Sequence, residues 1–375
     1  MMRSFLPLLL VLAALWTWNG CTNPTTDDDF DPGSPFDGAE ADRGTWKWIP
    51  VDGMLTRTGA ETGIGVRLAD EDAAGLMIYL QGGGACFNDA SCDNNPKTFN
   101  ANDFLTWALL AGNAGIFNRG QAANPVKDWH MVFVPYTTGD LHFGQSPSTD
   151  PAADEKHHVG YENMQLILDL FTPYFTEVDD VLLTGSSAGG YGATFNWAEA
   201  EAAFGSIPVH LVNDCGPLPA DDAAFAPCLQ QRFRDEFQLD ASLPAGCTDC
   251  FSVSGDSLDQ LYAFYGNQFS AAEGNLGLLA YKEDAVIRAF FDYGTDDCAN
   301  IEGGFGSYAG TIMEDAIIDL NDNHLAPNNW STFMMDGTAH VALGGSSFYN
   351  KTINGTTLAE WVSNVIAGTQ TNLVE

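Results

Sequence analysis

Residues 181–192 read VLLTGSSAGGYG, and this stretch decides the fold. The apolar run Val181–Thr184 predicts a buried strand. It breaks into a glycine-rich turn, which leads into the helical stretch Ala193–Ala203. A G-x-S-x-G sequence between a strand and a helix exposes one serine hydroxyl at the edge of a sheet, where the helix N-terminus favours developing negative charge. Ser187 is therefore the candidate nucleophile, and Ser186 occupies the variable position of the motif.

Short apolar runs alternate with helical spacing along the rest of the chain, a pattern typical of an α/β protein. The other predicted strands are Trp46–Val51, Gly63–Leu68, Leu76–Gln81, Trp129–Pro135, Val209–Asn213, Leu276–Tyr281 and Ser331–Met335, and further helices are predicted over Asp103–Ala114 and Tyr161–Phe171. We expect one α/β-hydrolase-like domain over residues 45–375, with a mostly parallel central sheet flanked by helices. A cysteine-bearing insertion at about 214–270 is expected to form a cap over the site.

A second glycine-rich stretch, Gly82–Gly84, directly follows the predicted strand Leu76–Gln81. In α/β hydrolases, backbone N–H groups in the loop after the third strand supply half of the oxyanion hole. The role needs N–H groups with no side chain in the way. Gly83 and Gly84 are therefore candidates, with the N–H of Ala188 as the other half. The alternative is a plain tight turn.

The base and the acid of a serine hydrolase of this fold follow the nucleophile in the order acid, then histidine. His340 comes shortly after the last predicted strand and is the candidate base. Asp284 follows a strand closely and is the first choice for the acid, while Glu283, Asp292 and Asp256 remain alternatives.

Asp140 and His142 follow another predicted strand and should lie at the same sheet edge as the glycines. They are candidates for contact with substrate or for bracing the site, and we favour bracing. An Asp-x-His pair also binds metal ions, but only His157 and His158 could complete such a site, so the signal is weak. The predicted chemistry requires neither a metal nor an organic cofactor.

The N-terminus predicts export. Arg3 precedes an apolar run in residues 1–20 that is short for a membrane span, so residues 1–21 are interpreted as a signal peptide. Gly20-Cys21 suggests lipoprotein processing with lipid on Cys21, which would give a bacterial outer-membrane or surface lipoprotein rather than a secreted protein. Residues 22–44 are acidic and rich in Pro and Gly, and we expect a flexible linker there.

The chain is strongly acidic, with 14 Lys plus Arg against 50 Asp plus Glu and a formal net charge of −36. Such a surface repels nucleic acid and anionic lipid, which we exclude as partners. Added salt screens self-repulsion, so we expect stability to rise with ionic strength. We expect a monomer.

Seven cysteines follow Cys21, at positions 86, 92, 215, 228, 247, 250 and 298. In an exported protein this count allows three disulfides and one spare thiol. Cys86 and Cys92 are close enough in sequence to close one loop. Cys247 and Cys250 are interpreted as structural rather than as a zinc or redox pair, because no second ligand pair lies nearby. The connectivity of the last five cysteines stays open.

Four segments, YLQGGGACFNDASC, VPYTTGDLHFG, LLTGSSAGGYGATFNW and MDGTAHVAL, occur in this order between Leu76 and Leu343. Together they resemble the pectin acetylesterase/Notum family of serine carboxylesterases. The resemblance implies an α/β-hydrolase fold, and a catalytic Ser187, Asp284 and His340 with oxyanion donors Gly83, Gly84 and Ala188. Thr137 departs from the family, where relatives often have cysteine.

The sequence therefore predicts an exported serine esterase that hydrolyses carboxylic esters, above all acetyl esters on a polysaccharide, through an acyl-enzyme. Pectin is a polyanion, and a protein of this charge attracts it poorly unless salt or calcium screens the repulsion. A neutral acetylated polysaccharide or an acylated small molecule is as plausible a substrate. The alternatives are a general or lipid-directed carboxylesterase and a non-catalytic surface-binding lipoprotein.

Overall fold

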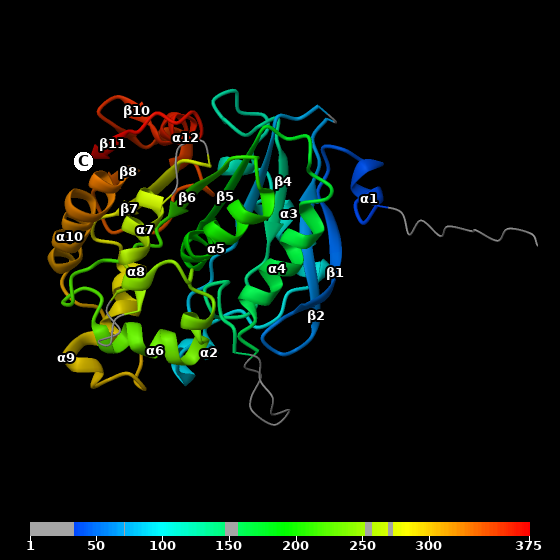
Figure 1. Cartoon of the computed structure of the whole chain (residues 1–375). Coiled ribbons are helices and arrows are strands. Elements are labelled where there is room, and N and C mark those ends of the chain that lie inside the picture. Colours follow the sequence, from blue (N-terminus) through cyan, green and yellow to red (C-terminus); the bar gives the residue numbers. More distant parts are fainter. Residues whose placement is uncertain (1–33, 71, 147–156, 252–256, 269–272) are drawn as a thin grey trace, which may run out of the picture. The chain divides into compact units, whose positions relative to one another are not determined.

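The computed structural model describes residues 34–70, 72–146, 157–251, 257–268 and 273–375. Within these residues, nine strands form one sheet in the order β1-β2-β4-β3-β5-β6-β7-β8-β11 (Figure 1). They are β1 (Lys47–Leu55), β2 (Glu61–Arg67), β3 (Gly75–Leu80), β4 (His130–Val134), β5 (Asp180–Ser186), β6 (Val209–Asp214), β7 (Leu276–Tyr281), β8 (Trp330–Met335) and β11 (Asn372–Val374). The short strands β9 (Thr352–Ile353) and β10 (Thr356–Thr357) pair separately.

The sheet is mostly parallel, as predicted. β1 pairs antiparallel with β2, and β2 with β4, while every pairing from β4 to β11 is parallel. The registers align the strand ends, because Ser186 of β5 lies beside Asp214 of β6 and Tyr281 of β7 lies beside Met335 of β8. Loops that follow these carboxyl ends therefore start at one sheet edge, where ligands bind in open α/β sheets.

Helices lie on both faces of the sheet (Figure 1). Strand β5 shows the division, because Val181 and Leu183 point into one hydrophobic core and Leu182 points into the other. The first core draws on α4 (Gly160–Phe171), α5 (Ala188–Phe204), α6 (Pro227–Phe237), α7 (Gln260–Gln268), α8 (Ala285–Phe291) and α10 (Gly310–Asp319). The second draws on α3 (Ala101–Leu110), α11 (Ser347–Asn350) and α12 (Leu358–Ile366). The short helices α1 (Asp37–Glu40), α2 (Asp89–Asp93) and α9 (Thr295–Cys298) complete the set of α-helices in the described residues.

The predicted elements are present with modest shifts in their ends. Strand β7 has the predicted bounds, whereas α5 begins at Ala188 instead of Ala193. Gly189, Gly190 and Gly192 suggest a longer loop, but they lie inside the first turns of α5, where backbone and side-chain atoms of neighbouring segments come too close for a Cβ. No element is predicted after Met335, whereas α11, α12 and β11 follow it.

The predicted linker 22–44 is too long at its C-terminal end. The packed unit begins at Phe36, which is fully buried and whose ring centroid lies 4.4 Å from that of Tyr174. Arg43 also donates to the Ala69 carbonyl at 2.6 Å. An acidic, Pro- and Gly-rich composition predicts disorder on average, but one aromatic anchor is enough to dock this segment on the core.

The predicted insertion lies between β6 and β7 and contains α6 and α7. Disulfides join Cys228 to Cys298, at α6 and α9, and Cys247 to Cys250 within the insertion. A third joins Cys86 to Cys92, as expected, and Cys215 is a free, buried thiol. The predicted count of three disulfides and one spare cysteine after Cys21 is thus confirmed.

The predictions for the signal peptide (1–21), for lipid on Cys21 and for most of the linker fall outside the described residues. Among the residues that are described, no helix combines the length and the apolar character needed to cross a bilayer.

Candidate active site

Ser187 occupies a sharp turn between β5 and α5. Its backbone angles are φ 59° and ψ −122°, a sparsely populated region for a residue with a side chain, and it is the N-cap of α5. The two glycines of the motif permit this turn, because a Cβ at Gly185 would lie 2.3 Å from the Gly189 carbonyl oxygen and a Cβ at Gly189 1.9 Å from that of Leu80. Ser187 is half-buried, and its Oγ makes no hydrogen bond to another described residue.

The glycine loop after β3 is held by side chains that bind its carbonyl groups. Asn95 donates to the Gly83 carbonyl at 2.8 Å, and the Tyr136 hydroxyl donates to the Gly84 carbonyl at 2.7 Å. The Gly83 carbonyl and the Gly84 N–H belong to one trans peptide group, so they point in opposite directions. Because Asn95 binds the carbonyl, the Gly84 N–H points away from Asn95. A Cβ at Gly83 would lie 2.5 Å from the Tyr136 ring, so the close approach needs glycine.

His340 and Asp284 form a hydrogen-bonded pair. His340 Nδ1 lies 2.7 Å from Asp284 Oδ2. The other oxygen, Oδ1, accepts from the backbone N–H groups of Val286 and Ile287, because Asp284 is the N-cap of α8. Asp284 is 1% exposed and its carboxylate is hydrogen-bonded through both oxygens, so the position and the orientation of the carboxylate are fixed.

The alternative acids lie elsewhere. A Cβ at Gly310 would meet Glu283 Oε2, and a Cβ at Gly306 would meet Asp292 Oδ2, so these carboxylates face the start of α10 and the loop before it. Asp256 lies outside the described residues. The sulfur of Cys215 lies within 4.8 Å of the ligand atoms of Asp284 and His340. Burial raises the pKa of this thiol, which keeps it protonated, and Nδ1 is engaged by the carboxylate, so these three groups fit a hydrogen-bonded site better than a metal site.

One residue that the sequence reasoning missed connects the two halves of the site. The backbone carbonyl of Asp214, at the end of β6, accepts from the Ser187 N–H at 2.7 Å. Its carboxylate accepts from the N–H groups of Ala342 and Leu343, at 2.9 and 3.0 Å. The Ser187 turn and the loop that carries His340 are therefore bound to the same residue.

Asp140 and His142 brace the loop after β4. Asp140 is fully buried and accepts from the Thr138 hydroxyl at 2.6 Å and from the Gly160 N–H at 2.7 Å. Burial raises the pKa of its carboxyl to about 6. His142 Nε2 lies 2.8 Å from the carbonyl of Gln81, next to the glycine loop, and burial lowers the pKa of its ring to about 4. The neutral ring therefore donates to that carbonyl.

A small apolar hollow lies beside Ser187. We call it the Ser187 hollow, and it is lined by Gly84, Ala85, Leu141, Ser187, Ala188, Tyr191, Phe233, Ile287, Phe290 and Phe291. Its volume is about 20 Å³. A cavity needs about 10–15 Å³ on this measure to hold one water molecule, so the hollow has room for a group of about methyl size. Phe233 comes from α6, so the insertion contributes one wall.

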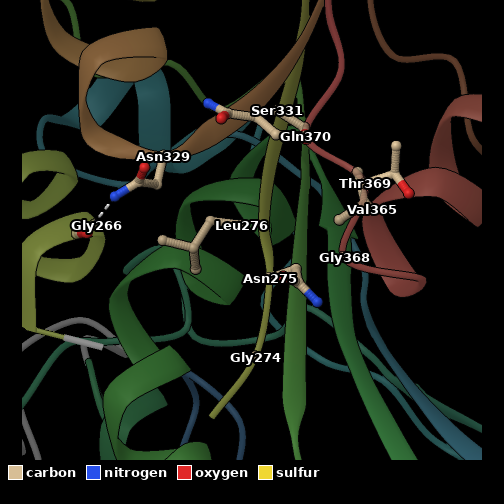
Figure 2. Close-up of a pocket in the computed structure, with 10 residues that line it drawn as sticks. All are labelled: Gly266, Gly274, Asn275, Leu276, Asn329, Ser331, Val365, Gly368, Thr369 and Gln370. Carbon is tan, nitrogen blue, oxygen red and sulfur yellow. Dashed lines mark hydrogen bonds between the residues drawn. The ribbon is translucent and has the colours of Figure 1, made fainter. Parts of the chain in front are cut away.

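A larger pocket of about 330 Å³ lies at the other edge of the sheet. Figure 2 shows its lining, in which Leu276 and Ser331 belong to the amino-terminal ends of β7 and β8. Asn329 donates to the Gly266 carbonyl at 3.0 Å on one wall, and Gln370 lies on another (Figure 2). Because Ser187, Asp284 and His340 follow the carboxyl ends of their strands, this pocket is not part of their site.

Comparisons with known proteins agree with this architecture. Residues 69–267 match the sequence model of a family described as Pectinacetylesterase. Palmitoleoyl-protein carboxylesterase notum1a of Danio rerio is 32% identical over 124 residues, which are 32% of this chain and 24% of that protein. Palmitoleoyl-protein carboxylesterase NOTUM of Mus musculus is 30% identical over 150 residues, 37% of this chain and 29% of that protein. This chain thus spans only about a quarter of the length of these relatives.

The solved structure of the Wnt deacylase Notum from Drosophila superimposes with a TM-score of 0.64 and 19% identity, and covers 88% of this chain and 96% of that one. At this identity the likeness concerns the fold, and it confirms the predicted α/β-hydrolase-like architecture.

Proposed function

The chain belongs to the pectinacetylesterase family, and from this premise we propose that it is an exported serine carboxylesterase that removes short acyl groups, above all acetyl, from an esterified carbohydrate. The observation that carries the proposal is the strained Ser187 at the same sheet edge as the His340–Asp284 pair. Strain of this kind persists only where the surrounding structure holds it, and it is concentrated at functional sites.

In the proposed mechanism, Ser187 Oγ attacks the ester carbonyl while His340 takes the hydroxyl proton. Asp284 engages Nδ1, so Nε2 is the nitrogen that acts as the base. The charge on the tetrahedral oxygen is stabilised by the N–H groups of Gly83–Gly84 and Ala188. The intermediate then expels the alcohol, which leaves with the proton from His340.

The acyl-enzyme is hydrolysed by the same groups. Water gives a proton to His340 and attacks the acyl carbon. As the second tetrahedral intermediate breaks down, His340 returns this proton to Ser187 Oγ and the carboxylic acid is released. No step needs an oxidant or a cofactor.

The acyl group is proposed to be short because of the Ser187 hollow. A methyl group fits a volume of about 20 Å³, whereas a longer acyl chain would have to extend out of the hollow. The names of the curated relatives specify a palmitoleoyl ester, so a long-chain or general carboxylesterase is the second candidate. The volume of the hollow favours the acetyl ester.

The alcohol part of the substrate follows from charge. With a net charge of −36, the protein favours a neutral acetylated polysaccharide or small ester over a polyanion. Three disulfides support an exported protein. Attachment through lipid on Cys21 and a monomeric state belong to the same proposal.

The test is labelling with a fluorophosphonate and hydrolysis of p-nitrophenyl acetate by the wild type, Ser187→Ala and Ser186→Ala. We expect the wild type and Ser186→Ala to label, and Ser187→Ala to lose both labelling and turnover with its melting temperature kept. A folded Ser187→Ala variant with full turnover would exclude Ser187 as the nucleophile. A wild type that neither labels nor hydrolyses the ester would instead favour the non-catalytic surface-binding lipoprotein.

A further inference from the structure

We propose that Asp214 is a positioning residue of this site, a second buried acid that fixes the His340 loop against the Ser187 turn and supports the protonated imidazole. The inference rests on the proposed function, because it assigns a role relative to Ser187 and His340.

Asp214 binds the nucleophile's turn in two ways. Its backbone carbonyl accepts from the Ser187 N–H at 2.7 Å, and its carboxylate Oδ2 accepts from the Ser186 hydroxyl at 2.6 Å. Ser186 Oγ in turn accepts from the Tyr79 hydroxyl at 2.8 Å, so a chain of three polar groups runs from β3 to the end of β6. All three side chains are buried, which fixes their geometry.

The same carboxylate binds the loop after His340. Oδ1 accepts from the Ala342 N–H at 2.9 Å, and Oδ2 accepts from the Leu343 N–H at 3.0 Å. Val341, between His340 and these residues, has a φ of 58°, so the backbone turns sharply just beyond the imidazole. Two amides fixed to one rigid carboxylate hold this turn, and with it the position from which the imidazole must reach the hydroxyl.

The carboxylate also contributes charge. Tyr79, Cys215, Tyr281 and His340 interact with this carboxylate, and of these four only His340 is a cation when protonated. Asp284, which binds Nδ1, is the other acid beside the imidazole. Burial raises the pKa of Asp214, and the three hydrogen bonds from Ser186, Leu343 and Ala342 oppose this. Both oxygens of Asp214 accept hydrogen bonds, as an ionised carboxylate does, and a negative charge at this position favours the imidazolium that forms when His340 takes the serine proton.

A carboxylate that only holds two loops together should affect kcat alone, whereas one that also stabilises the protonated imidazole of His340 should affect the pH dependence of kcat/KM as well. The decisive variant is Asp214→Asn, which keeps the shape but replaces one acceptor oxygen by an amide that cannot accept from a backbone N–H. We expect kcat for p-nitrophenyl acetate to fall about 100-fold, as for a catalytic group displaced by about 1 Å, with KM little changed. We also expect the acidic limb of kcat/KM against pH to move to lower pH, because the negative charge is lost.

Asp180→Asn is the matched control. Asp180 begins β5, at the opposite end of the sheet strands, and its Oδ1 lies 3.0 Å from His210 Nε2. This variant removes an acidic partner of a histidine without touching the site, so its kcat and its acidic limb should match the wild type.

A second variant keeps the inference testable if Asp214→Asn does not fold. Ser186→Ala removes one donor but keeps the charge, and we expect a loss in kcat of about fivefold with an unchanged acidic limb. An unchanged kcat in either variant, or an Asp214→Asn variant whose kcat falls while the acidic limb stays in place, overturns the proposal. An inactive wild type overturns the proposed function together with this inference, whereas an active wild type with an indifferent Asp214→Asn overturns the inference alone.

Discussion

Phe290 is expected to limit the length of the acyl group. Its half-buried ring lines the Ser187 hollow, and a Cβ at Gly84 would lie only 2.7 Å from the ring. The ring also packs edge-on against Phe305, at a centroid distance of 5.1 Å. The ring thus contacts the glycine loop and the exposed Phe305, so its removal should enlarge the hollow.

The magnitude follows from the methylenes that Phe290→Ala would accommodate. A butyryl group has two methylenes more than acetyl, and each buried methylene contributes about 0.8 kcal/mol. If both methylenes are buried only in the variant, the transition state for the butyrate ester is stabilised by about 1.6 kcal/mol relative to that for the acetate ester. The ratio of kcat/KM for butyrate to kcat/KM for acetate then rises about 15-fold. The stability cost should be well below the roughly 3–5 kcal/mol of a fully buried phenylalanine, because this ring is half-exposed.

The assay is kcat/KM for a series of p-nitrophenyl esters from acetate to octanoate. The wild type should prefer acetate, and Phe290→Ala should gain on butyrate relative to acetate. Phe251→Ala is the control, since Phe251 is 38% exposed and is not part of the hollow. A wild type that prefers octanoate, or a variant with an unchanged ratio, would refute the assignment of the hollow to the acyl group.

Four further outcomes are expected. Asp284→Asn should lower kcat by about 10⁴-fold without unfolding the protein, because the imidazole loses the partner that sets its tautomer; kcat near the wild-type value would point to another acid. Asn95→Ala should lower kcat about 10-fold at constant KM, since the Gly84 N–H loses its orientation, as measured on p-nitrophenyl acetate. The pKa of the Asp140 carboxyl is raised to about 6 in the folded state, so its contribution to stability is full below about pH 4 and is lost as the pH rises through 6. The Asp140→Asn variant has no such loss. Its free energy of unfolding, measured by denaturant titration, should therefore increase relative to that of the wild type by about 3 kcal/mol between pH 4 and 7. The melting temperature should rise with added NaCl because of the net charge of −36, and a flat salt dependence would contradict this.

The ends of the central strands could be predicted from the sequence because burial restricts which residues these strands can contain. A strand buried on both faces must be apolar throughout, so LGLLAY has sharp boundaries and places Asp284 close to a sheet edge. Asp284 follows β7 and His340 follows β8. Because these two strands are parallel, the loops after them start at the same sheet edge, which allows Asp284 and His340 to form their hydrogen bond.

Contacts between residues that are distant in the sequence could not be predicted in this way. The cysteines of the 228–298 disulfide are separated by 70 residues, and nothing local to Cys228 indicates that α9 lies beside α6. Phe36 is similar, because its burial depends on aromatic groups of α4 and the following turn, more than 130 residues later. Composition describes a segment, whereas docking depends on the surface that the segment meets.

Asp214 and Asp284 show that a position at the end of a strand does not by itself tell which acid binds the His340 ring. Both lie at or just after the carboxyl ends of neighbouring parallel strands, and both end up buried near His340. The ring of His340 binds Asp284, while the backbone just beyond it binds Asp214. The difference arises from the turn at Val341, which directs the amides of Ala342 and Leu343 toward β6 and leaves Nδ1 facing β7. In the proposed mechanism the imidazole needs an acid partner and its loop needs a fixed position, and residues at the ends of the neighbouring strands β7 and β6 would supply one each.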